Sequence, residues 1–379
     1  MNRTFWVDLM RIVGALLVVV IHVSGRVAGG YAVENKGEAV GSLGWLVSQW
    51  GDLGSSVAVP LFVMVSGALL LGRNEETSPF YRKRFGKILV PFLAWSCIFV
   101  LCLWIAGKGF KDGTPITLVS SIGAFLSGGI SGHFWFMYML ISLYLVAPFL
   151  SAFVRNASKN MLTCFLILWF FAVVIFPVID ATAKGTLGIV GITSDIRFEF
   201  NIRYESIAYW VCFFIAGYAL KDVLISKRLA IVALIFWFCF SVTGSVNGYL
   251  LRNYPDSSMA FLFTFMGTYI VPIISHQVTL TLCAFLALRS LGDIPALASS
   301  RFGQMISIIA PLTFGIYLCH HLFVVPSMGI LDKLIGIGST GSWLLALCAI
   351  PTLTVIFFSA AAVLVYLIRW SRFLKFLAP

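Results

Sequence analysis

Two ionisable side chains eleven positions apart, Arg11 and His22, lie in the first hydrophobic stretch of the chain. Eleven helical steps make about three turns plus ~20° and rise ~16 Å, so both side chains lie on one face. Asp8 lies one turn before Arg11 and is spaced to pair with it. Ionisable residues inside a membrane span are costly and indicate a functional site. His22 suits a general base acting on a hydroxyl group. A proton relay or a structural polar cluster is the alternative.

A second candidate is the basic segment that opens the third hydrophobic stretch. Arg82, Lys83, Arg84 and Lys87 lie within six residues. Arginine binds phosphate through two hydrogen bonds, and lysine adds a point charge. The segment therefore fits a donor that carries phosphate groups, such as acyl-coenzyme A. Taken alone, the segment is more simply explained as a topology signal that also contacts anionic lipids.

Aromatic and imidazole side chains open the fourth hydrophobic stretch. His133, Trp135 and Tyr138 combine hydrogen-bonding groups with stacking surface, as a carbohydrate-binding platform does. An aromatic belt at the membrane interface would have the same composition. We expect these three residues to bind an acceptor.

The ninth hydrophobic stretch contains Tyr317 and the adjacent pair His320 and His321. We expect Tyr317 and His320 to line the same cavity. Two adjacent histidines suggest a metal ligand set. In one continuous helix, however, their side chains point about 100° apart, and no carboxylate or cysteine pattern completes a tetrahedral site. The sequence therefore predicts no metal site.

The overall composition indicates a polytopic membrane protein. Of the 379 residues, 60% are hydrophobic and only 11% are charged, and the mean hydropathy is +0.98. A helical span needs ~20 apolar residues. We predict an all-α fold with one membrane domain over 1–379, no soluble domain, and ten spans: about 5–28, 43–72, 86–107, 133–154, 161–179, 206–221, 227–247, 268–289, 304–328 and 342–369.

The charge distribution orients these spans. With ten spans both termini face one side, which carries seventeen of the 26 Lys and Arg residues, against nine on the other. The positive-inside rule then places both termini in the cytoplasm. The net charge of +11 is explained by this asymmetry, and we expect no nucleic-acid partner.

The order of these motifs resembles the membrane-bound acyltransferase 3 family of bacterial inner-membrane O-acyltransferases. Its most specific part is the Arg11–His22 pair with its Asp8 lead-in. The second stretch, with Val59-Pro60-Leu61-Phe62 and Ser66-Gly67, also resembles the family, and its Ser-Gly pair permits close helix packing. The basic entry to the third stretch, His133-Phe134-Trp135-Phe136 and Tyr317-Leu318-Cys319-His320 follow in order. The family often has a second arginine where this chain has Lys87, so bidentate binding is lost at that position.

The resemblance implies O-acyl transfer, with acyl-coenzyme A as a co-substrate on the cytoplasmic face and no bound cofactor. The acceptor would be a glycan or an undecaprenyl-linked saccharide. Stand-alone members with this His-Phe-Trp-Phe segment resemble acetyltransferases that modify surface polysaccharides such as enterobacterial common antigen. Arg11, Arg82, Arg84 and Lys87 would bind the donor, and His22 would act as the base, with Asp8 orienting Arg11.

A transporter or flippase of a lipid-linked saccharide is the alternative function. Buried cations would then bind the pyrophosphate of the lipid carrier. Such a carrier needs no base at mid-depth, and the chain shows no internal repeat of the kind common in secondary transporters.

Overall fold

The computed structural model describes residues 5–27, 42–110, 112–176, 179, 207–254, 276–335 and 342–378. The regular elements in these ranges are all helical, which confirms the predicted all-α membrane protein. Seven helical segments of the described ranges are long and apolar enough to cross a membrane: Phe5–Val27, Leu43–Leu70, Thr77–Ile105, Gly132–Asn156, Lys227–Leu250, Arg301–Cys319 and Trp343–Trp370.

The helices of the first half are α1 (Phe5–Val27), α2 (Leu43–Ser55), α3 (Ala58–Leu70), α4 (Thr77–Ile105), α5 (Leu118–Ser127), η1 (Gly132–Phe134), α6 (Trp135–Asn156), α7 (Lys159–Phe170) and the π-helical turn η2 (Phe171–Ile175). Those of the second half are α9 (Ile207–Leu220), α10 (Lys227–Asn253), α13 (Gln277–Leu291), α14 (Pro295–Ser299), α15 (Arg301–Ile309), η4 (Ala310–Leu312), α16 (Thr313–Cys319), α17 (His321–Ile335), α18 (Trp343–Trp370) and η5 (Lys375–Leu377).

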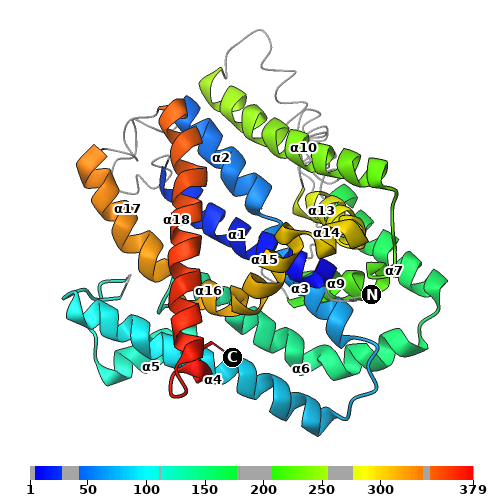
Figure 1. The fold of residues 1–379 in the computed structure, drawn as a ribbon, viewed down its shortest axis with the longest axis horizontal. Coiled ribbons are helices and arrows are strands. Elements are labelled where there is room, and N and C mark those ends of the chain that lie inside the picture. Colours follow the sequence, from blue (N-terminus) through cyan, green and yellow to red (C-terminus); the bar gives the residue numbers. More distant parts are fainter. Residues whose placement is uncertain are drawn as a thin grey trace, which may run out of the picture.

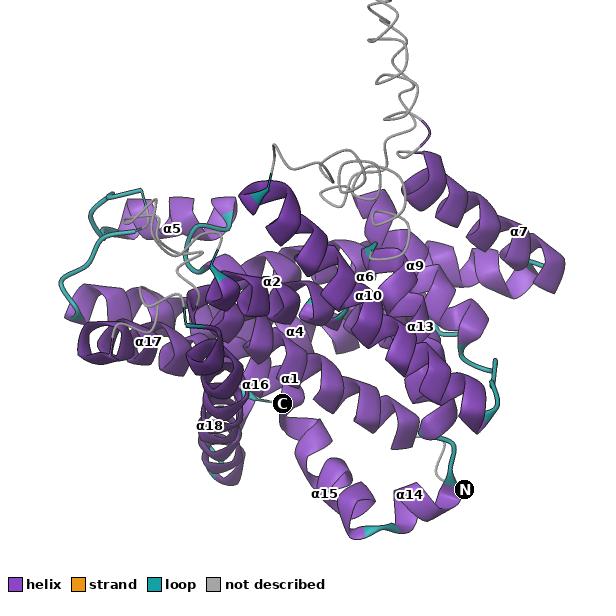
Figure 2. Cartoon of the chain, turned by 90° about the horizontal axis from the view of Figure 1, so that it is seen from above, coloured by secondary structure: helices purple, strands orange, loops and turns teal. Residues whose placement is uncertain are grey.

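Helix α1 lies in the middle of the bundle (Figure 1). It contacts α2, α3, α13, α15, α16, α17 and α18. Viewed from above, α14 and α15 lie at the edge near the N-terminal end of α1 (Figure 2). The apolar side chains of α1, among them Met10, Val19 and Val23, are almost fully buried by these neighbours. The helix that carries the Arg11–His22 stripe is therefore fixed from several sides.

Nine of the ten predicted spans overlap described helices over most of their length. Within the described residues, Lys159–Ile175, α9 and α13 fall in a class of apolar helices of 10–17 residues, as does α5, which had not been predicted as a span. The predicted span 268–289 lies partly outside the described residues. The count of ten spans and the cytoplasmic location of both termini stay predictions.

The prediction of one continuous span over 304–328 was wrong. Helix α16 ends at Cys319, and α17 begins at His321 and takes a different direction (Figure 1). At this break the carbonyl of Tyr317 accepts a hydrogen bond from His320 Nδ1 at 2.7 Å. The carbonyl of Leu318 accepts one from His133 Nε2 at 3.3 Å. Carbonyls at a helix end need such partners, so imidazole side chains satisfy the end of α16.

Helices α3 and α9 approach each other closely through glycine. A Cβ atom added to Gly67 would overlap the carbonyl oxygen of Phe214, and one added to Gly217 would overlap that of Met64. Small residues let helix backbones approach closely inside a membrane. This contact confirms the interpretation of the Ser66–Gly67 pair as a close-packing element.

Candidate functional site

Four histidines from three separate parts of the chain form one cluster. His22 of α1 lies with its ring centroid 4.3 Å from His321 and 5.1 Å from His320. His133 of η1 lies 4.0 Å from His321 and 5.0 Å from His320, but 6.4 Å from His22. His133 and His320 are almost fully buried, whereas His22 and His321 are half-buried. We call His22, His133, His320 and His321 the histidine cluster.

The break between α16 and α17 is what brings His320 and His321 together beside His22. The sequence argument against a paired site assumed a continuous helix, in which the two side chains diverge. In the structure the two rings are 4.9 Å apart, centroid to centroid. Tyr317, which lies one turn before the break, donates its hydroxyl to the backbone carbonyl of His133. The break and η1 are thus held together by hydrogen bonds, and His22 of α1 packs against them through ring contacts.

A basic cavity of about 480 Å³ lies at the Arg11 end of α1. We define it by its three cations, Arg11 of α1, Lys87 of α4 and Arg369 of α18. Its wall also includes Ser66, Tyr144 and Tyr317. The predicted ten-span topology places all three cations on one side of the membrane, and in the structure they line one cavity. Three positive charges around one space can bind a phosphate-bearing molecule.

Only one of the three donor-binding cations predicted on α4 lies on this wall. Lys87 does, whereas Arg82 is exposed outside it and Arg84 pairs with Glu75 at 3.5 Å. Arg84 also lies over the ring of Phe80, 5.6 Å from its centroid. The donor-binding role of Arg82 and Arg84 therefore gains no support from the geometry. Arg369 takes their place, and in the sequence it could not be told from an ordinary topology signal.

The predicted contact between Asp8 and Arg11 is not formed. Among the described residues, the ion pairs closer than 4 Å are Arg84–Glu75 and Arg289–Asp293. Arg11 lines the basic cavity instead of folding back along the helix. Asp8, which is half-buried at the start of α1, acts on Arg11 only across a longer distance.

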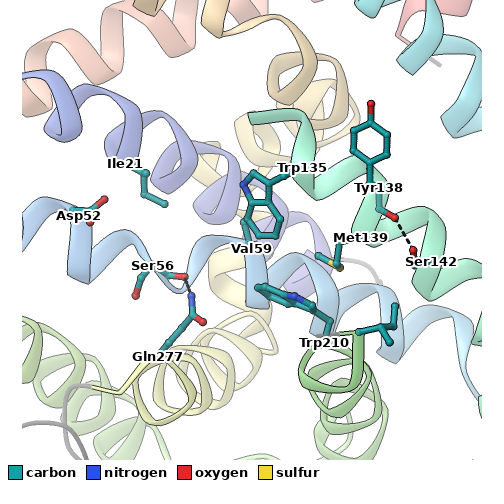
Figure 3. A pocket seen from close by; sticks show the side chains of 11 residues that line it. Ile21, Asp52, Ser56, Val59, Trp135, Tyr138, Met139, Ser142, Trp210 and Gln277 are labelled. Atoms are coloured by element: carbon teal, nitrogen blue, oxygen red, sulfur yellow. Dashed lines mark hydrogen bonds between the residues drawn. The ribbon is translucent and has the colours of Figure 1, made fainter. Parts of the chain in front are cut away.

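A second cavity, of about 690 Å³, lies on another face of α6 (Figure 3). We call it the tryptophan cavity and define it by Ile21, Asp52, Ser56, Trp135, Trp210 and Gln277. The ring centroids of Trp135 and Trp210 are 5.6 Å apart. The Gln277 amide donates to the carbonyl of Ser56 at 2.7 Å and accepts from the Tyr209 hydroxyl at 2.8 Å. Stacking surface, a carboxylate and an oriented amide are groups that bind a sugar.

The five predicted acceptor-binding residues separate into three places. Tyr317 lines the basic cavity, and His320 belongs to the histidine cluster. Trp135 and Tyr138 line the tryptophan cavity, but the Tyr138 hydroxyl points away from it (Figure 3) and donates to the Phe125 carbonyl. His133 lies in the histidine cluster, with both ring nitrogens bonded within the protein. Sequence reasoning missed Asp52, Trp210 and Gln277, because they are far apart in the chain and no spacing connects them.

The histidine cluster is linked to both cavities through neighbouring residues, but none of its four side chains lines either cavity. Ile21 lines the tryptophan cavity, and His22 follows it directly in α1. Tyr317 lines the basic cavity, and its ring centroid is 6.1 Å from that of His320, which neighbours His22. His22 is thus one residue from the wall of the tryptophan cavity and two ring contacts from the wall of the basic cavity.

Comparison with known proteins adds one finding. Residues 4–368 match a family model described as an acyltransferase domain. The searches of curated proteins and of solved structures each gave no match.

Proposed function

The chain belongs to the membrane-bound acyltransferase 3 family and is a multi-pass membrane acyltransferase, and we propose that it moves an acetyl group from acetyl-coenzyme A to a sugar hydroxyl. The acceptor is a cell-surface glycan or an undecaprenyl-linked saccharide, and the protein works in a bacterial inner membrane. The observation that supports this most directly is that His22 follows a wall residue of the tryptophan cavity and is linked through His320 to Tyr317 on the wall of the basic cavity.

In this proposal the basic cavity binds the donor from the cytoplasmic side. Arg11, Lys87 and Arg369 neutralise the phosphates of coenzyme A. The pantetheine arm extends along α1 toward His22. Coenzyme A is a co-substrate that enters and leaves, and the enzyme holds no prosthetic group.

The acceptor sugar occupies the tryptophan cavity and brings one hydroxyl to His22. His22 takes the proton of this hydroxyl while its oxygen attacks the thioester carbonyl. The C–S bond then breaks, and the leaving thiolate takes the proton from His22. The products are the sugar ester and free coenzyme A thiol, and His22 returns to its neutral form.

This function is tested with purified protein in lipid nanodiscs and radiolabelled acetyl-coenzyme A. We expect the donor to bind, and free thiol to appear only when envelope glycan or lipid-linked saccharide is added, with the label recovered in the saccharide. Failure of a folded protein to bind the donor would contradict the proposal. Movement of lipid-linked saccharide across a proteoliposome membrane without donor would favour the flippase.

Replacing Arg369 tests the donor-binding residue that was not predicted from the sequence and that the structure places on the basic cavity. Arg369→Ala removes one of three cavity cations and should weaken acetyl-coenzyme A binding about fivefold, or roughly 1 kcal/mol. The loss should shrink at high salt, because exposed charge pairs are screened. Isothermal titration at two ionic strengths measures it. Arg372→Ala, which removes an exposed arginine outside the cavity, should bind like the wild type. Equal binding by both variants would remove Arg369 from the donor site.

Replacing Trp135 tests the acceptor site. This side chain is 45% exposed, so Trp135→Ala removes stacking surface with little loss of core packing. We expect the acceptor KM to rise about fivefold, with the donor KM unchanged, because a ring stacked on a sugar contributes roughly 1 kcal/mol. The matched control is Trp104→Ala on α4, where the tryptophan is 64% exposed and lies away from both cavities. An unchanged acceptor KM in Trp135→Ala would place the sugar elsewhere.

A further inference from the structure

Three members of the histidine cluster converge as metal ligands do. One ring nitrogen each of His22, His320 and His321 lies within 4.8 Å of the other two. His22 lies in the C-terminal half of α1, and His320 and His321 lie at the break between α16 and α17. The fixed break sets the relative position of His320 and His321, and the packing of α1 against α16 and α17 adds His22.

Hydrogen bonds determine which nitrogen of His320 is free. A carbonyl oxygen accepts but never donates, so the contact with the Tyr317 carbonyl places the proton on His320 Nδ1. In the neutral ring Nε2 then carries a lone pair. His320 Nε2 is buried and has no hydrogen-bond partner among the described residues. A buried lone pair without a partner is unfavourable, which indicates that something binds there.

The same reasoning shows which ring nitrogen of His321 carries the proton, through its contacts with Ser131 and His133. The Leu318 carbonyl requires a proton on His133 Nε2, so His133 Nδ1 accepts from the Ser131 hydroxyl at 2.8 Å. Ser131 has one proton to donate, so its oxygen accepts from His321 Nδ1 at 3.3 Å. His321 Nε2 is then the free lone pair. His133 has no free nitrogen and serves to position His321.

The ligand set determines the kind of ion. Neutral imidazole nitrogens suit Zn²⁺, Co²⁺, Ni²⁺ and Cu²⁺, whereas Mg²⁺ and Ca²⁺ require oxygen ligands. A tetrahedral zinc ion with Zn–N distances of roughly 2.0–2.1 Å places its nitrogens about 3.3 Å apart. The nitrogens here lie within 4.8 Å, so ring rotations and shifts of about an ångström close the site. The hydrogen bonds from His320 and His321 to Tyr317 and Ser131 are the outer contacts that orient metal-binding imidazoles.

We propose that His22, His320 and His321 bind a divalent transition-metal ion of the zinc class, and that this ion blocks acyl transfer. The blocking role rests on the proposed function, in which His22 accepts a proton. Metal coordination and proton acceptance use the same lone pair of His22, so they exclude each other. The metal thus acts as a reversible inhibitor of the site.

Metal binding is tested without reference to activity. Full-length protein in nanodiscs is stripped with a chelator and titrated with Co²⁺, whose tetrahedral complexes absorb strongly in the visible range. We expect one Co²⁺ per chain with tetrahedral bands, displacement by Zn²⁺, and thermal stabilisation by Zn²⁺. His321→Gln should weaken Zn²⁺ binding at least tenfold. His276→Gln, which alters a histidine outside the cluster, should bind like the wild type. Wild-type protein without tetrahedral bands, or equal binding by His321→Gln, would overturn the site.

The inhibitory role is tested in the acyl-transfer assay. Zn²⁺ should stop turnover of the wild type, and chelator should restore it. His321→Gln should need at least tenfold more Zn²⁺ than the wild type to inhibit the same fraction of its own Zn²⁺-free turnover. Loss of activity on chelation, restored by Zn²⁺, would overturn the inhibitory role. Protein that binds Co²⁺ tetrahedrally but transfers no acyl group contradicts only the proposed function, and protein that transfers without binding contradicts only this inference.

Discussion

His22→Ala is expected to lower acyl transfer by about a hundredfold or more, the usual contribution of a general base. His22 is the only cluster histidine on α1, and in the proposed function its imidazole takes the proton of the acceptor hydroxyl. Donor and acceptor affinities should change little, because the cations and tryptophans of the two cavities are untouched. Single-turnover transfer of label, measured with saturating donor, isolates this effect.

Two variants separate chemistry from packing in this experiment. His22→Gln keeps a polar side chain of similar volume against His320 and His321 and should be as inactive as His22→Ala. His276→Ser removes a histidine from the N-cap of α13, where its ring accepts from the Val278 N–H at 3.2 Å, but keeps an oxygen for that bond. It should transfer normally. Near-normal transfer by His22→Gln would show that the imidazole is not the base.

Gly67→Ala is expected to destabilise the protein by about 1–3 kcal/mol or more and to reduce both activity and folded yield. The added methyl group would overlap the Phe214 carbonyl, and backbone cannot move aside as a side chain can. Helices α3 and α9 must therefore separate. Because α3 carries Ser66 on the basic cavity and α9 carries Trp210 on the tryptophan cavity, both cavities would widen. Thermal unfolding in detergent measures the loss.

The chain offers a matched glycine for comparison. Gly86 also lies inside a helix, α4, but a Cβ atom there meets nothing within 4 Å. Gly86→Ala should leave the midpoint of unfolding unchanged or raise it, because alanine favours a helix over glycine by up to about 1 kcal/mol. If Gly67→Ala unfolds at the same temperature as Gly86→Ala, the close contact of α3 and α9 does not limit stability.

The sequence predicted the features that depend on local spacing. Hydropathy defined most of the helices, and the eleven-residue interval placed Arg11 and His22 on one face of α1. The Ser66–Gly67 pair predicted a close helix contact. Each of these follows from the geometry of a single helix, so no knowledge of neighbouring elements was needed.

Features that depend on distant neighbours could not be predicted in this way. The break between α16 and α17 is stabilised by a hydrogen bond from His133 to the carbonyl of Leu318, 185 positions away, and an apolar stretch gives no sign of it. Arg84 was expected to bind the donor, yet Glu75, in the loop that precedes α4, pairs with it. The Gln277 amide on the wall of the tryptophan cavity donates a hydrogen bond to the carbonyl of Ser56, 221 positions away. Tertiary contacts decide these cases, and spacing along the chain does not report them.

Helix α6 has a consequence for the permeability of the membrane. One face of it lines the tryptophan cavity with Met139 and another lines the basic cavity with Phe136 and Leu140. The partition between the cavities is thus about one helix thick, or ~10 Å. In the proposed function the cavities open toward opposite compartments, so this partition carries much of the transmembrane voltage over a short distance. The apolar side chains of α6 then act as a barrier to ions. This barrier prevents ions from crossing the membrane through the two cavities.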